Sequence, residues 1–225
     1  MDNTGLIRGL YAITPETLDL ARLIVQVRQA IAGGAGIVQY RNKRIAHDIA
    51  RKQAEALRAV TRASGTLFIV NDDSDLAFSV GADGVHIGRD DGDAHTISRL
   101  REQRAKRLLS TPFMIGVSCY NELQRAETAV MAGADYIAFG SFFSSLTKPH
   151  AVRADIALIR AAKAQLDVPI VAIGGITINN AQQLISAEVD ALAVITALFD
   201  ADDIEQRARE FTNLFKRENH VQSQQ

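Results

Sequence analysis

Short apolar runs alternate along this chain with longer segments in which apolar positions recur at helical spacing. The short runs are typical of buried strands, and the longer segments are typical of amphipathic helices. The predicted strands are residues 10–13, 36–41, 67–70, 84–87, 113–117, 135–139, 169–173 and 191–195. The predicted helices are residues 18–32, 46–64, 74–80, 95–109, 121–131, 153–165, 179–186 and 202–216. Each predicted strand is thus followed by one predicted helix.

A weak internal repeat marks every second strand of this pattern. The segments Gly34-Ala35-Gly36, Gly81-Ala82-Asp83, Gly133-Ala134-Asp135 and Glu188-Val189-Asp190 each end a predicted helix and begin a strand. They recur about every 50 residues, which is room for two strand–helix units. A helix between consecutive strands makes those strands parallel.

These observations predict an α/β fold, a closed (β/α)8 (TIM) barrel formed as a single domain by residues 1–216. Residues 217–225 are polar, and we expect them to form a frayed tail. An open, doubly wound sheet is the alternative. It fits less well, because no Gly-x-Gly-x-x-Gly segment follows the first strand.

Composition narrows the class of protein. With 25 basic and 26 acidic residues the net charge is −1, which argues against sequence-independent nucleic-acid binding. The single cysteine, Cys119, excludes an internal disulfide and suits a reducing compartment. We find no membrane-spanning stretch and no signal-peptide pattern, so we expect a cytoplasmic protein without membrane partners. The sequence leaves a homo-oligomer open.

Two aspartates follow neighbouring predicted strands. Asp72 comes after the third strand and Asp91 after the fourth, so both leave the sheet at its carboxyl edge, where barrels bind ligands. Two carboxylates whose remaining ligands come from a substrate phosphate are typical of Mg²⁺. The alternative is that these acidic residues cap the following helices.

The second strand ends in the segment Gln39-Tyr40-Arg41-Asn42-Lys43. Alternate residues of an extended chain share a side, so Gln39, Arg41 and Lys43 are predicted to point together toward the barrel mouth. Two cations beside a magnesium ion suit a diphosphate. The alternative is a solvated basic loop.

Three further loops offer phosphate ligands. The loop over residues 139–149 carries Ser and Thr hydroxyls and Lys148, and it could fold over a site. Gly174-Gly175 ends the seventh strand and Ile195-Thr196 the eighth, where barrels commonly bind phosphate. The alternatives are an ordinary loop and a helix-entry turn that needs positive φ.

The fifth strand is followed by Ser118, which could hydrogen-bond a substrate or cap the next helix. Cys119 has no evident base partner and is predicted to be buried and inert. His86 is predicted to be a hydrogen-bonded core histidine. The sequence shows no Ser-His-Asp, Cys-His or zinc-binding pattern.

Taken in order, these segments resemble the thiamine-phosphate synthase family over residues 10–208. The resemblance rests on residues 39–43, 71–77, 81–88 and 116–118, on Thr147-Lys148 and on residues 173–176. It implies a transferase that joins a hydroxymethylpyrimidine diphosphate to a thiazole phosphate and releases diphosphate, with Mg²⁺ as cofactor.

The resemblance also assigns roles to residues. Gln39, Arg41, Lys43 and Asn71 would hold the pyrimidine diphosphate, with Tyr40 and Asn42 in the same binding segment. Asp72 and Asp91 would bind Mg²⁺, and Ser118 and Lys148 would contact the pyrimidine substrate. Ser145, Leu146, Thr147, Gly175, Ile195 and Thr196 would hold the thiazole phosphate. Arg41, Lys43, Ser118 and Lys148 would be the catalytic residues.

Three departures from the family pattern stand out. Ser141, Ser144 and Ser145 replace two prolines and a threonine, Arg89 stands where glutamine is usual, and Thr196 replaces a serine. Losing prolines should loosen the loop. The alternative functions are a thiazole tautomerase-like relative, a non-catalytic thiamine-precursor binding or regulatory protein, and another phosphate-handling barrel enzyme.

Overall fold

Eight parallel strands close into a barrel in which each strand pairs with its neighbours in sequence and β1 pairs with β8. The structure is a computed structural model that describes residues 4–88, 93–107, 113–144 and 152–222, with side chains to residue 216. The strands are β1 (Gly9–Ile13), β2 (Ile37–Tyr40), β3 (Leu67–Asn71), β4 (Gly84–Ile87), β5 (Met114–Tyr120), β6 (Tyr136–Phe139), β7 (Ile170–Ile173) and β8 (Ala191–Val194). The predicted closed (β/α)8 barrel is confirmed.

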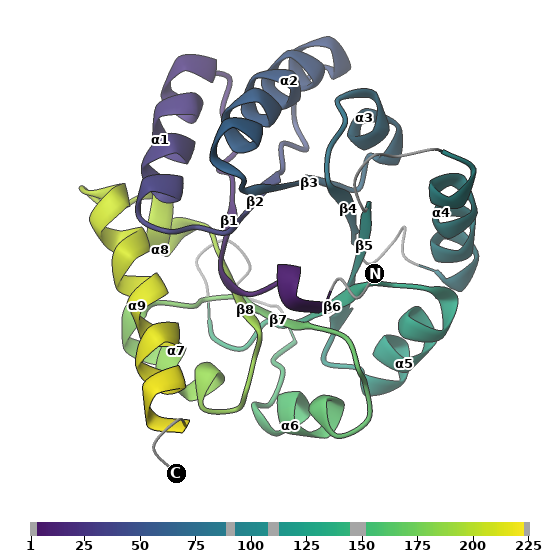
Figure 1. The fold of residues 1–225 in the computed structure, drawn as a ribbon, viewed down its shortest axis with the longest axis vertical. Coiled ribbons are helices and arrows are strands. Elements are labelled where there is room, and N and C mark those ends of the chain that lie inside the picture. The colour runs from purple at the N-terminus through teal and green to yellow at the C-terminus, as the bar shows by residue number, and fades with distance from the viewer. Residues whose placement is uncertain (1–3, 89–92, 108–112, 145–151, 223–225) are drawn as a thin grey trace.

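The helices form a ring outside the strands (Figure 1). They are α1 (Leu20–Ala32), α2 (His47–Ser64), α3 (Ser74–Ser79), α4 (Ala94–Lys106), α5 (Leu123–Ala132), α6 (Ala157–Lys163), α7 (Ile178–Ile185), α8 (Thr196–Phe199) and α9 (Ile204–Gln222). A 3-10 turn, η1 (Thr4–Leu6), precedes β1 and lies across the centre of the ring of strands. Ile7, which follows η1, is fully buried in the barrel interior and helps to close its amino end.

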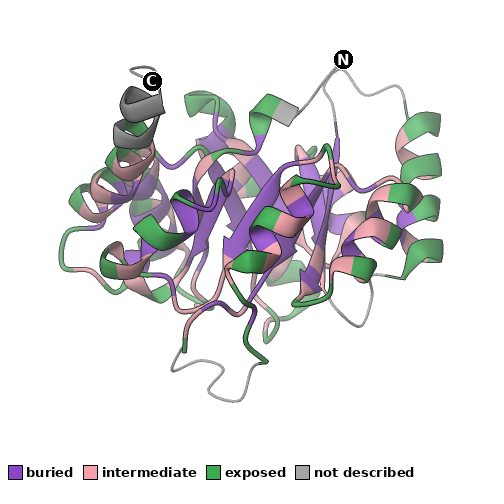
Figure 2. Ribbon diagram, turned by 90° about the horizontal axis from the view of Figure 1, so that it is seen from below, coloured by how far each residue is buried: buried purple, intermediate pink, exposed green. Residues whose placement is uncertain are grey.

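The apolar core has two layers, one between strands and helices and one inside the barrel. Figure 2 shows the buried residues concentrated in the strands and on the helix faces that meet them. The inner layer contains two large polar aromatics, Tyr11 on β1 and Tyr136 on β6, each at most 1% exposed. Because both hydroxyls need partners inside an apolar barrel, they constrain what else lies there.

The structure differs from the predicted elements mainly at four places. Helix α6 begins at Ala157 instead of residue 153 and ends at Lys163. Strand β5 runs to Tyr120, with an irregular register between Ser118 and Tyr120. Helix α8 was not predicted, because four residues are too few to show a period. Helix α9 continues to Gln222, through much of the segment that was predicted to be a frayed tail.

Three aspartates tie the amino end of the barrel together, and they are the last residues of three of the four repeated segments seen in the sequence. Each aspartate directly precedes an even-numbered strand. Its carboxylate accepts a backbone N–H from the preceding odd-numbered strand and pairs with a basic residue on the helix that leads into that odd-numbered strand. These sets are Asp83 with Phe68 and Arg58, Asp135 with Ile115 and Arg104, and Asp190 with Ile170 and Lys163, at 2.5–2.9 Å. The repeat therefore marks structural joints.

We predict that Asp83→Asn lowers the free energy of unfolding by about 3 kcal/mol, because it breaks a bidentate pair with Arg58 that is largely shielded from water. The matched control is Glu55→Gln, which removes one charge from the exposed Arg51–Glu55 pair. That change should cost less than about 0.5 kcal/mol. Urea unfolding measures both, and equal losses would contradict the role of Asp83.

Candidate active site

Asp72 stands at the carboxyl end of β3 and faces the barrel mouth. Its φ of 61° lies in the left-handed region, which Asp tolerates better than most residues. Its backbone N–H donates to the carbonyl of His86 on β4 at 2.8 Å, which fixes the residue between two strands. The capping alternative is excluded for Asp72, because the neighbouring Asp73 caps α3 by accepting the Leu76 N–H at 2.8 Å.

Three donors converge on the Asp72 carboxylate. The backbone N–H of Gly88 donates to Oδ1 at 2.8 Å, while Asn71 Nδ2 and Lys43 Nζ lie 2.7 and 2.8 Å from Oδ2. Burial raises the pKa of Asp72, but the hydrogen bond from Lys43, the Gly88 N–H and the positive charge of Lys43 together hold it below the usual value. The group is therefore an anion at neutral pH.

The ionised Asp72 carboxylate is a ligand that fits a hard divalent cation. Ionised carboxylate oxygen is what Mg²⁺ prefers, and Mg²⁺ commonly takes only one or two protein carboxylates beside substrate phosphates. Among the residues that the structure describes, no three or more His, Cys, Asp or Glu side chains cluster as metal ligands would. The second predicted ligand, Asp91, lies outside the described residues.

The two predicted cations of the β2 loop both lie at the mouth and both contact carboxylates. Arg41 Nη1 is 2.7 Å from Glu16 Oε1, and its backbone N–H donates to Thr14 Oγ1 at 3.0 Å. Lys43 contacts Asp72. Glu16 was not identified in the sequence, because it follows the first strand in an otherwise unremarked turn.

The side chains of the β2 segment lie on both sides of the barrel wall. Gln39 lies on the inner side, and Tyr40 and Asn42 lie on the outer side. Gln39 is 2% exposed and points inward, where Nε2 donates to the Tyr11 hydroxyl at 2.8 Å. Tyr40 donates to Gln53 Oε1 on α2 at 3.0 Å. Asn42 Nδ2 donates to the same oxygen at 3.3 Å and to the Thr17 carbonyl at 2.9 Å. The side chains of Tyr40 and Asn42 therefore anchor the loop against α2 instead of lining the mouth, as the alternation along the strand requires.

The loops after β6 and β7 pack on each other. Gly174 and Gly175 have φ of 100° and 62°, so the turn needs the positive φ that the alternative interpretation expected. A Cβ on Gly175 would lie 2.4 Å from the carbonyl oxygen of Ser144, so only glycine permits this approach. Ile195 precedes α8 and Thr196 begins it, exposed to solvent. Ser145, Leu146, Thr147 and Lys148 lie outside the described residues.

Ser118 lies inside β5, so it does not cap the next helix, and its Oγ is 2.9 Å from His86 Nε2. His86 Nδ1 is 3.2 Å from the Tyr136 hydroxyl. Burial lowers the pKa of His86 to about 4 against the opposing effect of Asp72, and burial raises the pKa of Tyr11 and Tyr136. His86 is therefore a neutral core histidine, as predicted, but one bonded to a candidate site residue.

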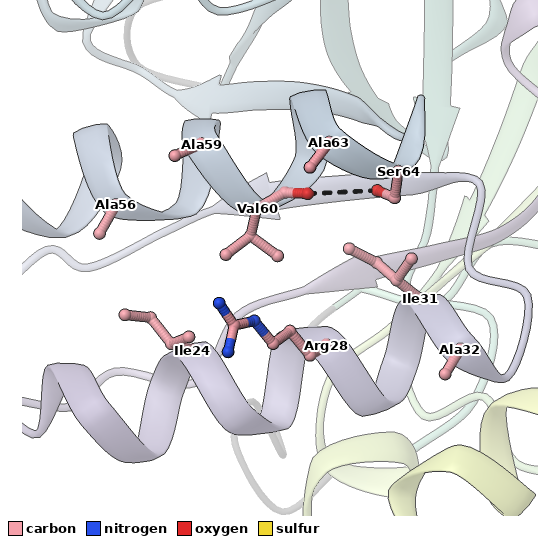
Figure 3. Close-up of a pocket in the computed structure, with 9 residues that line it drawn as sticks. All are labelled: Ile24, Arg28, Ile31, Ala32, Ala56, Ala59, Val60, Ala63 and Ser64. Carbon is pink, nitrogen blue, oxygen red and sulfur yellow. Dashed lines mark hydrogen bonds between the residues drawn. The ribbon is translucent and has the colours of Figure 1, made fainter.

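An apolar groove between α1 and α2 lies on the outside of the barrel, away from the mouth (Figure 3). Ile24, Arg28 and Ile31 from α1 face Val60 and Ala63 from α2 across it. It contains none of the predicted site residues. No described helix is both long and apolar enough to cross a membrane.

The fold and the mouth define a (β/α)8 barrel whose candidate site combines an ionised carboxylate with amide, hydroxyl and basic side chains. The sequence profile of the family described as "Thiamine monophosphate synthase" matches residues 10–198. This chain belongs to that family.

Individual relatives agree with this assignment. Thiamine-phosphate synthase of Methylobacillus flagellatus is 52% identical over 209 residues, which are 93% of this chain and 96% of the relative. Thiamine-phosphate synthase of Nitrosospira multiformis is 47% identical over 213 residues, covering 95% and 88%. The solved structure of thiamine phosphate pyrophosphorylase from Pyrococcus furiosus has a TM-score of 0.81 and 32% identity, and the match covers 96% of this chain and 98% of that chain.

The pH dependence of stability tests the neutral state of His86. Its folded pKa of about 4 lies below the ordinary value of 6.5, so between these values the unfolded chain binds more protons. The contribution of His86 to the free energy of unfolding is fully present above about pH 6.5. It falls by up to about 1.4 kcal/mol per pH unit as the pH drops toward 4.

Urea unfolding at about pH 7, 6 and 5 measures the effect. We predict that His86→Gln flattens the loss of stability on acidification, because the group that must be charged on unfolding is gone. His47→Gln, at a histidine whose side chain is 74% exposed, is the control and should retain the slope of the parent protein. An unchanged slope in His86→Gln would show that His86 is not the responsible group.

Proposed function

We propose that this chain is a thiamine-phosphate synthase. It condenses 4-amino-2-methyl-5-hydroxymethylpyrimidine diphosphate with 4-methyl-5-(2-phosphoethyl)thiazole to give thiamine phosphate and diphosphate. The observation that carries the proposal is the Asp72 carboxylate at the barrel mouth, ionised and in contact with Lys43, with Arg41 on the same loop. Carboxylate and cations together are what a magnesium diphosphate requires.

The diphosphate half of the site comprises the ends of β2 to β5. Arg41 and Lys43 bind the diphosphate oxygens, and Gln39, Asn71 and Ser118 orient the pyrimidine substrate. Lys148 adds a third cation, and Tyr40 and Asn42 hold the β2 loop in place through Gln53 on α2. The close approach of Phe143 and Ser144 to Gly175 supports a thiazole-phosphate site there, with Ser145, Leu146, Thr147, Ile195 and Thr196 as the other contributors.

Asp72 and Asp91 would hold Mg²⁺, which supplies positive charge to the departing diphosphate. The basic side chains contribute electrostatic stabilisation of the leaving group. The carbon–oxygen bond to the diphosphate breaks first, and Arg41, Lys43 and Lys148 stabilise the charge that grows on the leaving oxygens. The thiazole nitrogen then donates its electron pair to the pyrimidine methyl cation and forms the carbon–nitrogen bond. No nucleophilic side chain is needed, and the buried thiol of Cys119, whose pKa burial raises to about 12, is not used.

Substrate binding exchanges the partners of both cations. Lys43 contacts Asp72 and Arg41 contacts Glu16, so each cation is neutralised and held near the mouth. With Asp72 holding Mg²⁺, Lys43 would be free to bind the diphosphate. Metal and diphosphate would then bind with positive cooperativity, because the Lys43–Asp72 pair competes with both of them.

The reaction itself is the first test. Purified protein incubated with both substrates and Mg²⁺ should form thiamine phosphate and diphosphate in equal amounts, and EDTA should stop it. If thiazole phosphate binds but no product forms, a tautomerase-like or regulatory role replaces the synthase.

We predict that Asp72→Asn lowers kcat by at least about 100-fold and removes its dependence on Mg²⁺, because the amide keeps the shape and the backbone tolerance but loses the charge. Asp73→Asn is the matched control, since asparagine caps a helix as well as aspartate. Its kcat should stay within about threefold of the parent. Mg²⁺ titrations at saturating substrate compare the variants, and the same Mg²⁺ dependence in both would remove Asp72 as a ligand.

Lys43→Gln should lower kcat/KM for the pyrimidine diphosphate by about 30-fold or more, because a cation on the leaving group is lost. The next residue provides the control. Arg44 is 90% exposed, and Arg44→Gln should change kcat/KM by less than about threefold. Steady-state kinetics distinguishes them, and equal losses would mean that only the general positive charge of the loop matters.

A further inference from the structure

Five polar side chains from five strands form one hydrogen-bonded chain across the barrel interior. Gln39 Nε2 donates to the Tyr11 hydroxyl at 2.8 Å, and that hydroxyl is 2.9 Å from the Tyr136 hydroxyl. Tyr136 is in turn 3.2 Å from Nδ1 of His86, whose Nε2 is 2.9 Å from Ser118 Oγ. The chain joins β2, β1, β6, β4 and β5, and both of its ends are proposed substrate contacts.

The middle of this chain lies too deep to touch a substrate. Tyr11 is 1% exposed, Tyr136 is 0% exposed and His86 is 7% exposed. The rings pack closely, with centroids 6.3 Å apart for the two tyrosines and 5.6 Å apart for His86 and Tyr136.

The backbone makes room for the middle of the chain. A Cβ on Gly116 would lie 2.0 Å from Cζ of Tyr136, so the glycine leaves the space that the ring occupies. Phenylalanine would fill the same volume without the cost of a buried hydroxyl, so packing alone does not account for two tyrosines here.

The donor and the acceptor in each bond of this hydrogen-bonded chain can be assigned. Each hydroxyl carries one hydrogen, and a neutral imidazole has one donor nitrogen and one acceptor nitrogen. Gln39 donates to Tyr11, so the hydrogen of the buried Tyr11 hydroxyl has a partner only if it is donated to Tyr136. The Tyr136 hydrogen in turn has a partner only if it is donated to Nδ1 of His86. Full pairing of these buried hydrogens therefore selects one direction. His86 then carries its hydrogen on Nε2 and donates to Ser118 Oγ. The hydrogen of Ser118 is left for a partner at the barrel mouth.

We propose that Tyr11, Tyr136 and His86 are positioning residues that make Ser118 a hydrogen-bond donor to an acceptor atom of the pyrimidine diphosphate, and that they couple Gln39 to Ser118 across the barrel. The kinetic part of this proposal rests on the proposed synthase activity. The hydrogen-bond direction does not depend on it, because the direction is a property of the protein without substrate.

The tautomer of His86 tests the direction without any assay of activity. Long-range proton–nitrogen NMR of labelled protein, with the His86 signals assigned by their loss in His86→Gln, should show hydrogen on Nε2 and a bare Nδ1. Tyr136→Phe removes the donor to Nδ1 and should shift that nitrogen signal. Cys119→Ala, next to Ser118 but on the outward face of β5, should leave the signals unchanged. Hydrogen on Nδ1 in the parent protein would mean that the chain runs the other way and would overturn the proposal.

A double-mutant cycle tests the coupling to Ser118. Tyr136→Phe should lower kcat by about tenfold with little change in thermal stability, but by less than about twofold when Ser118 is already alanine. Tyr11→Phe, one bond further away, should show the same pattern with a smaller effect, and it replaces Tyr136→Phe if that variant does not fold. Losses that simply multiply with that of Ser118→Ala would overturn the positioning role. A parent protein without turnover would reject the synthase, while the tautomer would still decide the direction.

Discussion

The balance of charge around the Asp72 carboxylate is the constraint on which the rest of the mouth depends. Asp72 holds a left-handed backbone conformation between β3 and β4, and it receives donors from Gly88, Asn71 and Lys43. These contacts join the ends of three strands around one anion. Because they outweigh the effect of burial on its pKa, the carboxylate is charged at the place where we propose that a metal and a diphosphate bind.

Carboxylates serve opposite purposes at the two ends of the barrel. At the amino end, Asp83 and its counterparts before β6 and β8 each bind a strand N–H and a helix cation, so their charge is fully committed to the fold. At the carboxyl end, Asp72 and Glu16 pair with Lys43 and Arg41, the cations that we propose bind the diphosphate. This division follows the general rule that one end of such barrels stabilises and the other carries chemistry. The hydrogen-bonded side chains from Gln39 to Ser118 connect the apolar interior to the carboxyl end of the barrel.

The sequence predicted the barrel because each strand is a compact apolar run and a repeated three-residue segment precedes every second strand. It also predicted the placement of Asp72, since strand ends fix it. Strand alternation gave the side of β2 on which Gln39 lies, but Gln39 is buried on Tyr11 and does not point toward the mouth as predicted. The outward Tyr40 and Asn42 follow from the same alternation, but the family resemblance grouped them with the ligands. The bond between Tyr11 and Tyr136 was not predictable, because it joins residues 125 positions apart. Asp91 and Lys148, which lie outside the described residues, remain predictions.

The measurement that tests the account most directly is anomalous diffraction from crystals grown with Mn²⁺ and inorganic diphosphate, with Mn²⁺ in place of Mg²⁺. The account predicts an anomalous peak bonded to the Asp72 carboxylate, with the diphosphate against Arg41 and Lys43 and with Lys43 released from Asp72. A metal bound elsewhere, or a diphosphate at the mouth with Lys43 still on Asp72, would contradict it.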